Sequence, residues 1–149
     1  MADDMGRIGH YSVGYICGVF DLFHAGHLAI LRRCREHCDR LIVGVDSDDL
    51  TELYKSRRPV INQDDRMDII RELRCVDEVV LVDFHNDSPE RAWELYRFDV
   101  QFCGDDHEKG LQGARRFLRE HGADLVFFPY TIRISTTMIR KRTGRQQDE

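Results

Sequence analysis

The stretch Ser12–His27, SVGYICGVFDLFHAGH, decides the fold of this chain. Its first part, Ser12 to Phe20, is a run of small and apolar residues that predicts a buried strand. His24 and His27 follow at a strand-to-helix turn, with a glycine between them. A short apolar strand that leads into a helix is the repeating unit of parallel α/β sheets, and the remaining sequence continues the same alternation.

Four further apolar runs alternate with helix-like stretches. Strands are expected over 41–45, 78–82, 99–103 and 124–128, and helices over 27–38, from Asn62 or Asp64 to 74, over 89–96, 110–121 and 135–142. This pattern predicts an α/β fold: a single-domain, doubly wound, five-stranded parallel sheet over residues 12–142. Residues 1–11 are expected to form an N-terminal extension and residues 143–149 a disordered tail. Such sheets bind ligands beyond the carboxyl ends of their strands, at the switch point of the strand order.

The composition is that of an ordinary globular protein. The 149 residues are 42% hydrophobic and 33% charged, with a formal net charge of −5, which argues against a disordered chain and against a duplex nucleic-acid binder. No apolar run approaches the ~20 residues that span a bilayer, and the acidic, polar start is unlike a secretory signal. Five scattered cysteines suggest reduced thiols, so we expect a cytoplasmic protein. From the net charge and the short apolar runs, we expect no nucleic-acid or membrane partner.

The two histidines of the first turn are the first candidate site. A helix that begins near Ala25 places His24 and His27 at its positive end, and Gly26 lets a phosphate approach the backbone closely. The segment is neither a GxGxxG nor a Walker A loop. Three interpretations remain open here: phosphate chemistry, two polar residues that only close a turn, and a metal site, which lacks a third ligand.

A second candidate site follows the last strand, where residues 129–137 read PYTIRISTT. Three hydroxyl residues, Ser135, Thr136 and Thr137, open a helix and would form an anion-binding nest. Basic residues flank them, and no acidic residue lies between positions 130 and 143. An ordinary N-cap with a solvated basic face is the alternative. Because a parallel sheet can bring both helix starts to one edge, the two segments together favour a phosphate site.

Residues 55–59, KSRRP, lie between these segments. Three cations in four residues, followed by proline, suggest a mobile loop that closes over a polyphosphate. The alternative is an exposed basic loop.

Four segments, in order along the chain, resemble the nucleotidylyltransferase superfamily. GVFDLFHAGH at 18–27 resembles its G-x-F-D-x-x-H-x-G-H signature, and IRISTTMIRKR at 132–142 resembles its second signature. RCVDEVV at 74–80 resembles the RYVDEV segment of the cytidylyltransferase branch. FCGDDHEKG at 102–110 resembles the GDDW-type segment of the glycerol-3-phosphate cytidylyltransferases.

The resemblance implies an enzyme that transfers a cytidylyl group from CTP to a small phosphorylated alcohol, with glycerol 3-phosphate the leading acceptor. The products would be a CDP-alcohol and pyrophosphate. Mg2+ would arrive with the triphosphate, so no protein metal site is expected, and the family implies a homodimer.

The resemblance also implies roles for individual residues. Catalytic roles fall on His24, His27, Lys55, Arg133, Ser135 and Thr136, and acceptor binding on Asp21 and Lys55. The implied nucleotide contacts are Val19, Phe20, His24, Ala25, Gly26, His27, Arg57, Arg74, Asp105, Tyr130, Thr131, Ile132, Arg133, Ile134, Ser135, Thr136 and Thr137.

The chain departs from the branch in places. Tyr130 stands where an arginine usually contacts nucleotide phosphates, and Ile132 and Arg133 replace a Glu-Gly pair, so Arg133 is expected to restore the lost charge. Ala25 replaces an aromatic residue, and His107 replaces the tryptophan after GDD. These changes leave open an adenylyltransferase that uses ATP, and a nucleotide-binding regulator without catalysis.

The residue types suit the implied reaction. A phosphate monoester has a second pKa of about 6, so the attacking group is ionised at pH 7 and needs no general base. Catalysis then depends on positioning two polyanions and on stabilising the charge of the leaving group.

Overall fold

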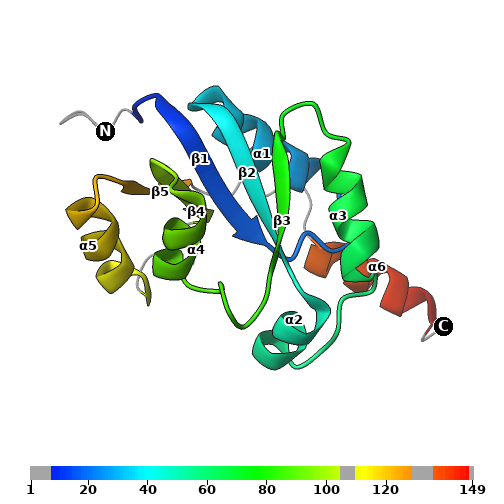
Figure 1. Ribbon diagram of the computed structural model, residues 1–149. Helices are drawn as coiled ribbons and strands as arrows, with labels where there is room; N and C mark the ends of the chain where they lie inside the picture. Colours follow the sequence, from blue (N-terminus) through cyan, green and yellow to red (C-terminus); the bar gives the residue numbers. More distant parts are fainter. Residues whose placement is uncertain (1–7, 105–109, 129–135, 148–149) are drawn as a thin grey trace.

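The computed structural model describes residues 8–104, 110–128 and 136–147 (Figure 1). Five strands form one parallel sheet in the order β3-β2-β1-β4-β5. Their bounds are Tyr11–Gly18 for β1, Cys38–Asp46 for β2, Glu78–Val82 for β3, Val100–Gly104 for β4 and Asp124–Phe128 for β5. The predicted doubly wound α/β fold is confirmed. Because the chain leaves β1 toward β2 and later returns to its other side as β4, the switch point lies between β1 and β4.

Helices cover both faces of the sheet. The helices are α1, Ala25–Glu36; α2, Asp48–Lys55; α3, Gln63–Arg71; α4, Pro89–Tyr96; α5, Gln112–Glu120; and α6, Thr136–Gln147. Leu31 of α1 and Ile70 of α3 pack with Val43 and Phe102 on one face. Ala92 of α4 and Leu118 of α5 pack on the other face (Figure 1). Alternate residues along each strand thus enter opposite cores, as a sheet covered on both sides requires.

Local caps explain where several helices begin and end. The side chains of Asn62 and Ser88 accept hydrogen bonds from backbone N–H groups in the first turns of α3 and α4, and Pro89 occupies the first position of α4. Gly122, with φ of +79°, closes the end of α5 in the left-handed region. These three signals were readable in the sequence, and the structure bears them out.

Several bounds differ by two or three residues, as in β2, which begins at Cys38 and not at 41. Two elements differ more. Helix α2 was not predicted; the Ser47 hydroxyl accepts a hydrogen bond from the Leu50 N–H, and Asp48 and Asp49 lie in its positive first turn. Helix α6 continues to Gln147 instead of ending near residue 142. Within this extension the Thr143 hydroxyl donates to the backbone oxygens of Ile139 and Arg140. Among the described residues, no helix is long and apolar enough to cross a membrane.

Candidate active site

His24 and His27 lie directly beyond the carboxyl end of β1, at the start of α1. His24 is the N-cap, and its Nδ1 accepts a hydrogen bond from the Gly26 N–H at 3.0 Å. His27 Nδ1 in turn accepts one from the His24 N–H at 3.2 Å. Because each Nδ1 accepts, each neutral ring carries its proton on Nε2. The rings stack with centroids 3.9 Å apart, so the turn presents two neighbouring Nε2–H donors.

Both histidines have lowered pKa values. Burial lowers the pKa of His24. Burial, followed by the nearby charge of His24, lowers the pKa of His27 to about 4. The lowered pKa values favour the neutral form of each ring, which donates a hydrogen bond through Nε2–H.

The second predicted segment meets this turn. The Thr136 hydroxyl, at the start of α6, donates to the backbone oxygen of Asp21 at 2.9 Å and lies 3.5 Å from His24 Nε2. Thr136 and His24 are 112 positions apart in sequence. Since the hydroxyl proton is directed at Asp21, its lone pairs are free to face the His24 Nε2–H. The structure thus brings the starts of α1 and α6 to one edge of the sheet.

Asp21 sits beneath this meeting point, with only 3% of the residue exposed. Its carboxylate accepts hydrogen bonds from the N–H groups of Val60 and Ile61, at 2.8 and 2.9 Å, and from Arg140 Nη2 at 2.5 Å. Burial acts to raise the pKa of Asp21, but these donors together hold it below its usual value. The resemblance implied that Asp21 binds the acceptor. Here its carboxylate is occupied by groups of its own chain and fastens two segments to the histidine turn.

The turn that carries Asp21 is strained. Phe20 and Leu22, on either side of Asp21, have φ of 54° and 51°, in the left-handed region that side chains disfavour. Each such residue costs about 1–3 kcal/mol and persists only where the surrounding contacts impose it. The bonds to Asp21 supply such contacts.

Arg66 is a site-forming residue that the sequence reasoning missed. Its side chain is fully buried on α3, and its guanidinium donates to the backbone oxygens of Val19, Asp46 and Ile61 and to the Asp48 carboxylate, at 2.7–2.8 Å. A signal was present in the sequence. Arg66 lies four residues before Ile70, on the face that the helix turns to the core.

The basic segment at 55–58 begins at the last residue of α2. Lys55 and Arg57 are exposed, and the Lys55 charge is one of the influences that lower the pKa of His27. Lys55 therefore lies on the histidine side of the molecule. Arg58 pairs instead with Asp49 and Glu52 of α2, at 2.9 and 2.7 Å. Two of the three predicted cations are thus left without an ion pair among the described residues.

The remaining predicted residues are distributed unevenly. The Phe20 ring lies 5.6 Å from that of His27, whereas the Val19 oxygen is engaged by Arg66. Ala25 and Thr137 are exposed at the two helix starts. Asp105, Tyr130, Thr131, Ile132, Arg133, Ile134 and Ser135 lie outside the described residues.

The structure corrects the expected nucleotide contact of Arg74. It lies in the turn between α3 and β3, which precedes the amino end of β3. His24 lies beyond the carboxyl end of β1, and all strands are parallel. The structure therefore places Arg74 at the opposite edge of the sheet, against the prediction that it contacts the same nucleotide.

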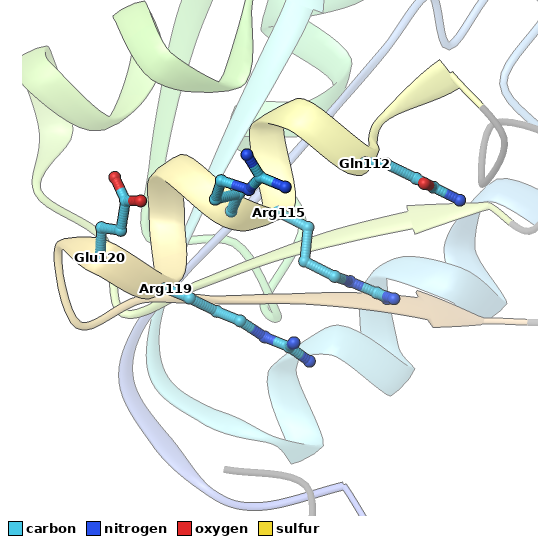
Figure 2. Close-up of a pocket in the computed structure, with 5 residues that line it drawn as sticks. Gln112, Arg115, Arg119 and Glu120 are labelled. Carbon is cyan, nitrogen blue, oxygen red and sulfur yellow. The ribbon is translucent and has the colours of Figure 1, made fainter.

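A surface hollow lies along α5 (Figure 2). It is lined by Gln112, Arg115, Arg116, Arg119 and Glu120. Arg115 lies over the Phe127 ring of β5 at 5.2 Å. Among the predicted site residues that the structure describes, none lines this hollow.

The sequence and the fold both have known relatives. A family model described as cytidylyltransferase-like matches residues 15–142. The bifunctional protein HldE of Hyphomonas neptunium is 32% identical over 142 residues, which are 93% of this chain and 29% of that protein. HldE of Mesorhizobium japonicum is 39% identical over 127 residues, 85% of this chain and 25% of that protein. The chain thus spans between a quarter and a third of the length of these relatives.

Solved structures share the fold at lower identity. The lipopolysaccharide core biosynthesis protein from Thermoplasma volcanium matches with a TM-score of 0.68 and 21% identity, over 81% of this chain and 97% of that one. The pantoate-β-alanine ligase from Francisella tularensis matches with a TM-score of 0.59 and 9% identity, over 92% of this chain and 70% of that one.

Proposed function

The chain belongs to the cytidylyltransferase-like family of nucleotidyltransferases, and on that premise we propose that it transfers a cytidylyl group from CTP to a small phosphorylated alcohol. Glycerol 3-phosphate is the leading acceptor, and the products are a CDP-alcohol and pyrophosphate. The observation that carries the proposal is the meeting of Thr136 with His24 at the carboxyl edge of the sheet.

The geometry supports a role for the histidines in the transition state. The two Nε2–H donors stand side by side, and backbone bonds to their Nδ1 atoms hold both rings in place. On binding, the His24 donor would exchange its neighbour Thr136 Oγ1, 3.5 Å away, for a phosphate oxygen. Negative charge builds on the bridging oxygen as pyrophosphate leaves the α-phosphorus. Donors aimed at such an oxygen typically contribute ~10²–10³ each to the rate.

Positive charge would come from other residues. Arg140 holds Asp21 through Nη2, while its buried Nε has no hydrogen-bond partner among the described residues. Lys55 and Arg57, both exposed, would hold the acceptor and nucleotide phosphates. We assign Arg133, Ser135 and Thr137 to the triphosphate as well, on the family signature. An Arg133→Ala variant with unchanged CTP affinity would remove Arg133 from this list.

Mg2+ would accompany the triphosphate and neutralise its oxygens. The residues that the structure describes contain no group of three or more His, Cys, Asp or Glu side chains able to hold a metal ion. The Asp21 carboxylate is already engaged by four donors of the chain. A hydrated ion carried mainly by the nucleotide fits this donor set.

Adenylyl transfer from ATP is the second candidate. The groups described at the site address a triphosphate, which all nucleoside triphosphates share. The residues expected to meet the base, Asp105 and Tyr130 among them, lie outside the described part of the chain. One fold neighbour is a lipopolysaccharide core biosynthesis protein. Because lipopolysaccharide cores are built from sugars, sugar phosphates belong among the acceptors tested.

One experiment separates these candidates. The protein is incubated with Mg2+, each of CTP, ATP, GTP and UTP, and a panel of phosphorylated alcohols and sugars, and pyrophosphate release is followed. Release with CTP and an alcohol phosphate supports the leading proposal, and release with ATP supports the second. Nucleotide binding without release under any condition would favour a regulator that has lost catalysis.

We also propose that the protein is a cytoplasmic homodimer, as the family resemblance implies. Sedimentation equilibrium tests the oligomeric state, and a mass of a single chain at micromolar concentration would reject the dimer.

A further inference from the structure

The carboxyl edge of the sheet contains a buried cation that the proposed chemistry does not use. Arg66 is 1% exposed, and it is the largest fully buried side chain among the described residues. A charge this deep is retained only when its hydrogen bonds are satisfied. Its four bonds go to three separate segments, at Val19, at the β2–α2 junction and at Ile61, so its role concerns how those segments sit relative to one another.

Each of these bonds fixes a segment that surrounds the site. The bond to Val19 holds the entry to the histidine turn, and the bond to Asp46 holds the end of β2. The bond to Ile61 holds the end of the segment that follows Lys55, and the bond to Asp48 holds the first turn of α2. A single rigid guanidinium therefore spans the histidine turn and the basic segment.

Ile61 is held from both sides. Its carbonyl accepts from Arg66 Nε at 2.8 Å, and its N–H donates to the Asp21 carboxylate at 2.9 Å. Asp21 in turn lies between the strained residues Phe20 and Leu22. The segment that follows Lys55 and Arg57 is thus fastened to the same turn that places His24.

We propose that Arg66 is a positioning residue. It fixes residues 55–61, which include the basic segment at 55–58, relative to the histidine turn so that both reach one triphosphate. This inference rests on the proposed function for its effect on turnover. Lysine cannot replace Arg66, because an ammonium group lacks the planar fork of donors that reaches several carbonyls at once. A group misplaced by about 1 Å can cost roughly 10² in rate even when the substituted residue is remote from the chemistry.

The test compares Arg66→Lys with Ile70→Val, which removes one methyl group from the core one turn further along α3, where Ile70 is fully buried. Three quantities are measured: Tm, kcat and KM for pyrophosphate release, and hydrogen exchange at the Val60 and Ile61 amides. We expect Arg66→Lys to lower kcat about 10²-fold, with a smaller change in KM, and to speed exchange at these two amides. Ile70→Val lowers Tm but leaves kcat and that exchange unchanged.

Amide exchange decides the positioning role even if the wild-type protein releases no pyrophosphate, which would reject the proposed function alone. Unchanged exchange at Val60 and Ile61 in Arg66→Lys would overturn the inference. The inference would also be overturned if Arg66→Lys lowered kcat no more than Ile70→Val does when the two variants have the same Tm. If Arg66→Lys does not fold, Asp48→Asn is the second variant. It removes the negative charge from the Arg66–Asp48 ion pair, in which the Asp48 side chain is 16% exposed, and it should speed exchange at the same amides.

Discussion

Arg140 and Asp21, 119 positions apart in the chain, form an ion pair in which Nη2 and Oδ2 are separated by 2.5 Å. The side chains are 20% and 2% exposed, so the pair is shielded from water. It joins α6, which begins with Thr136, to the turn that carries His24. The distance between the two family signatures is therefore set by a carboxylate buried within the first of them.

Replacing Arg140 with alanine should destabilise the protein by about 2–3 kcal/mol, because the buried Asp21 carboxylate loses a charged donor. Urea unfolding measures the change. Arg142→Ala, an exposed position on the same helix, is the matched control and should change stability by less than about 0.5 kcal/mol. Equal stability of the two variants would show that the pair does not anchor α6.

His24 has two separable roles, as the cap of α1 and as an Nε2–H donor. Asparagine keeps the cap, since its side-chain oxygen can accept the Gly26 N–H, but it lacks a donor at the Nε2 position. His24→Asn should therefore keep the Tm of the wild type and lower turnover at least about tenfold. His24→Ala should lose both the cap and the donor, so both Tm and turnover should fall. Wild-type turnover in His24→Asn would exclude the donor role.

Thr136→Val removes the hydroxyl while keeping the shape of the side chain, and Thr136→Ser keeps the hydroxyl. Because the hydroxyl bonds to the Asp21 oxygen beside His24, we expect Thr136→Val to lower turnover by about tenfold or more, and Thr136→Ser by much less. Pyrophosphate release at saturating nucleotide measures both. A larger loss in Thr136→Ser than in Thr136→Val would indicate that shape, and not the hydroxyl, matters at this position.

His27 makes the stability of the protein depend on pH. Its pKa falls from about 6.5 in the unfolded chain to about 4 in the folded protein, so the unfolded chain binds more protons between these values. Stability should be complete above pH 6.5 and should decline as the pH falls toward 4, by at most about 3 kcal/mol. His27→Gln should flatten this part of the profile. A wild-type profile that is level between pH 6.5 and 4.5 would contradict the lowered pKa.

Local sequence signals predicted much of the fold. Strand β5 and helix α4 have the expected bounds, because a short apolar run and the Ser-Pro cap at 88–89 are encoded within a few residues. Helix α2 was missed because it has few apolar side chains, and because five of its eight residues are exposed. Its formation depends on Ser47 and on contacts with Arg66 and Gln63.

The site was predictable only in part, for a similar reason. The motifs indicated His24 and Thr136, but not that Asp21 would hold Arg140, Val60 and Ile61. Hydrogen bonds to backbone groups from distant segments leave no residue pattern in one sequence. Arg74 was misplaced for a related reason: the motif indicates a residue type, whereas the direction of α3 determines the edge of the sheet at which the residue lies.

A double-mutant cycle on His24→Asn and Thr136→Val tests the central claim most directly, by kcat/KM for pyrophosphate release with the best nucleotide and acceptor. If the two side chains act on one triphosphate, the double variant should lose much less than the product of the single losses, with a coupling above about 0.5 kcal/mol. Losses that multiply within twofold would show that the two residues act independently, and the account of a shared site would be wrong.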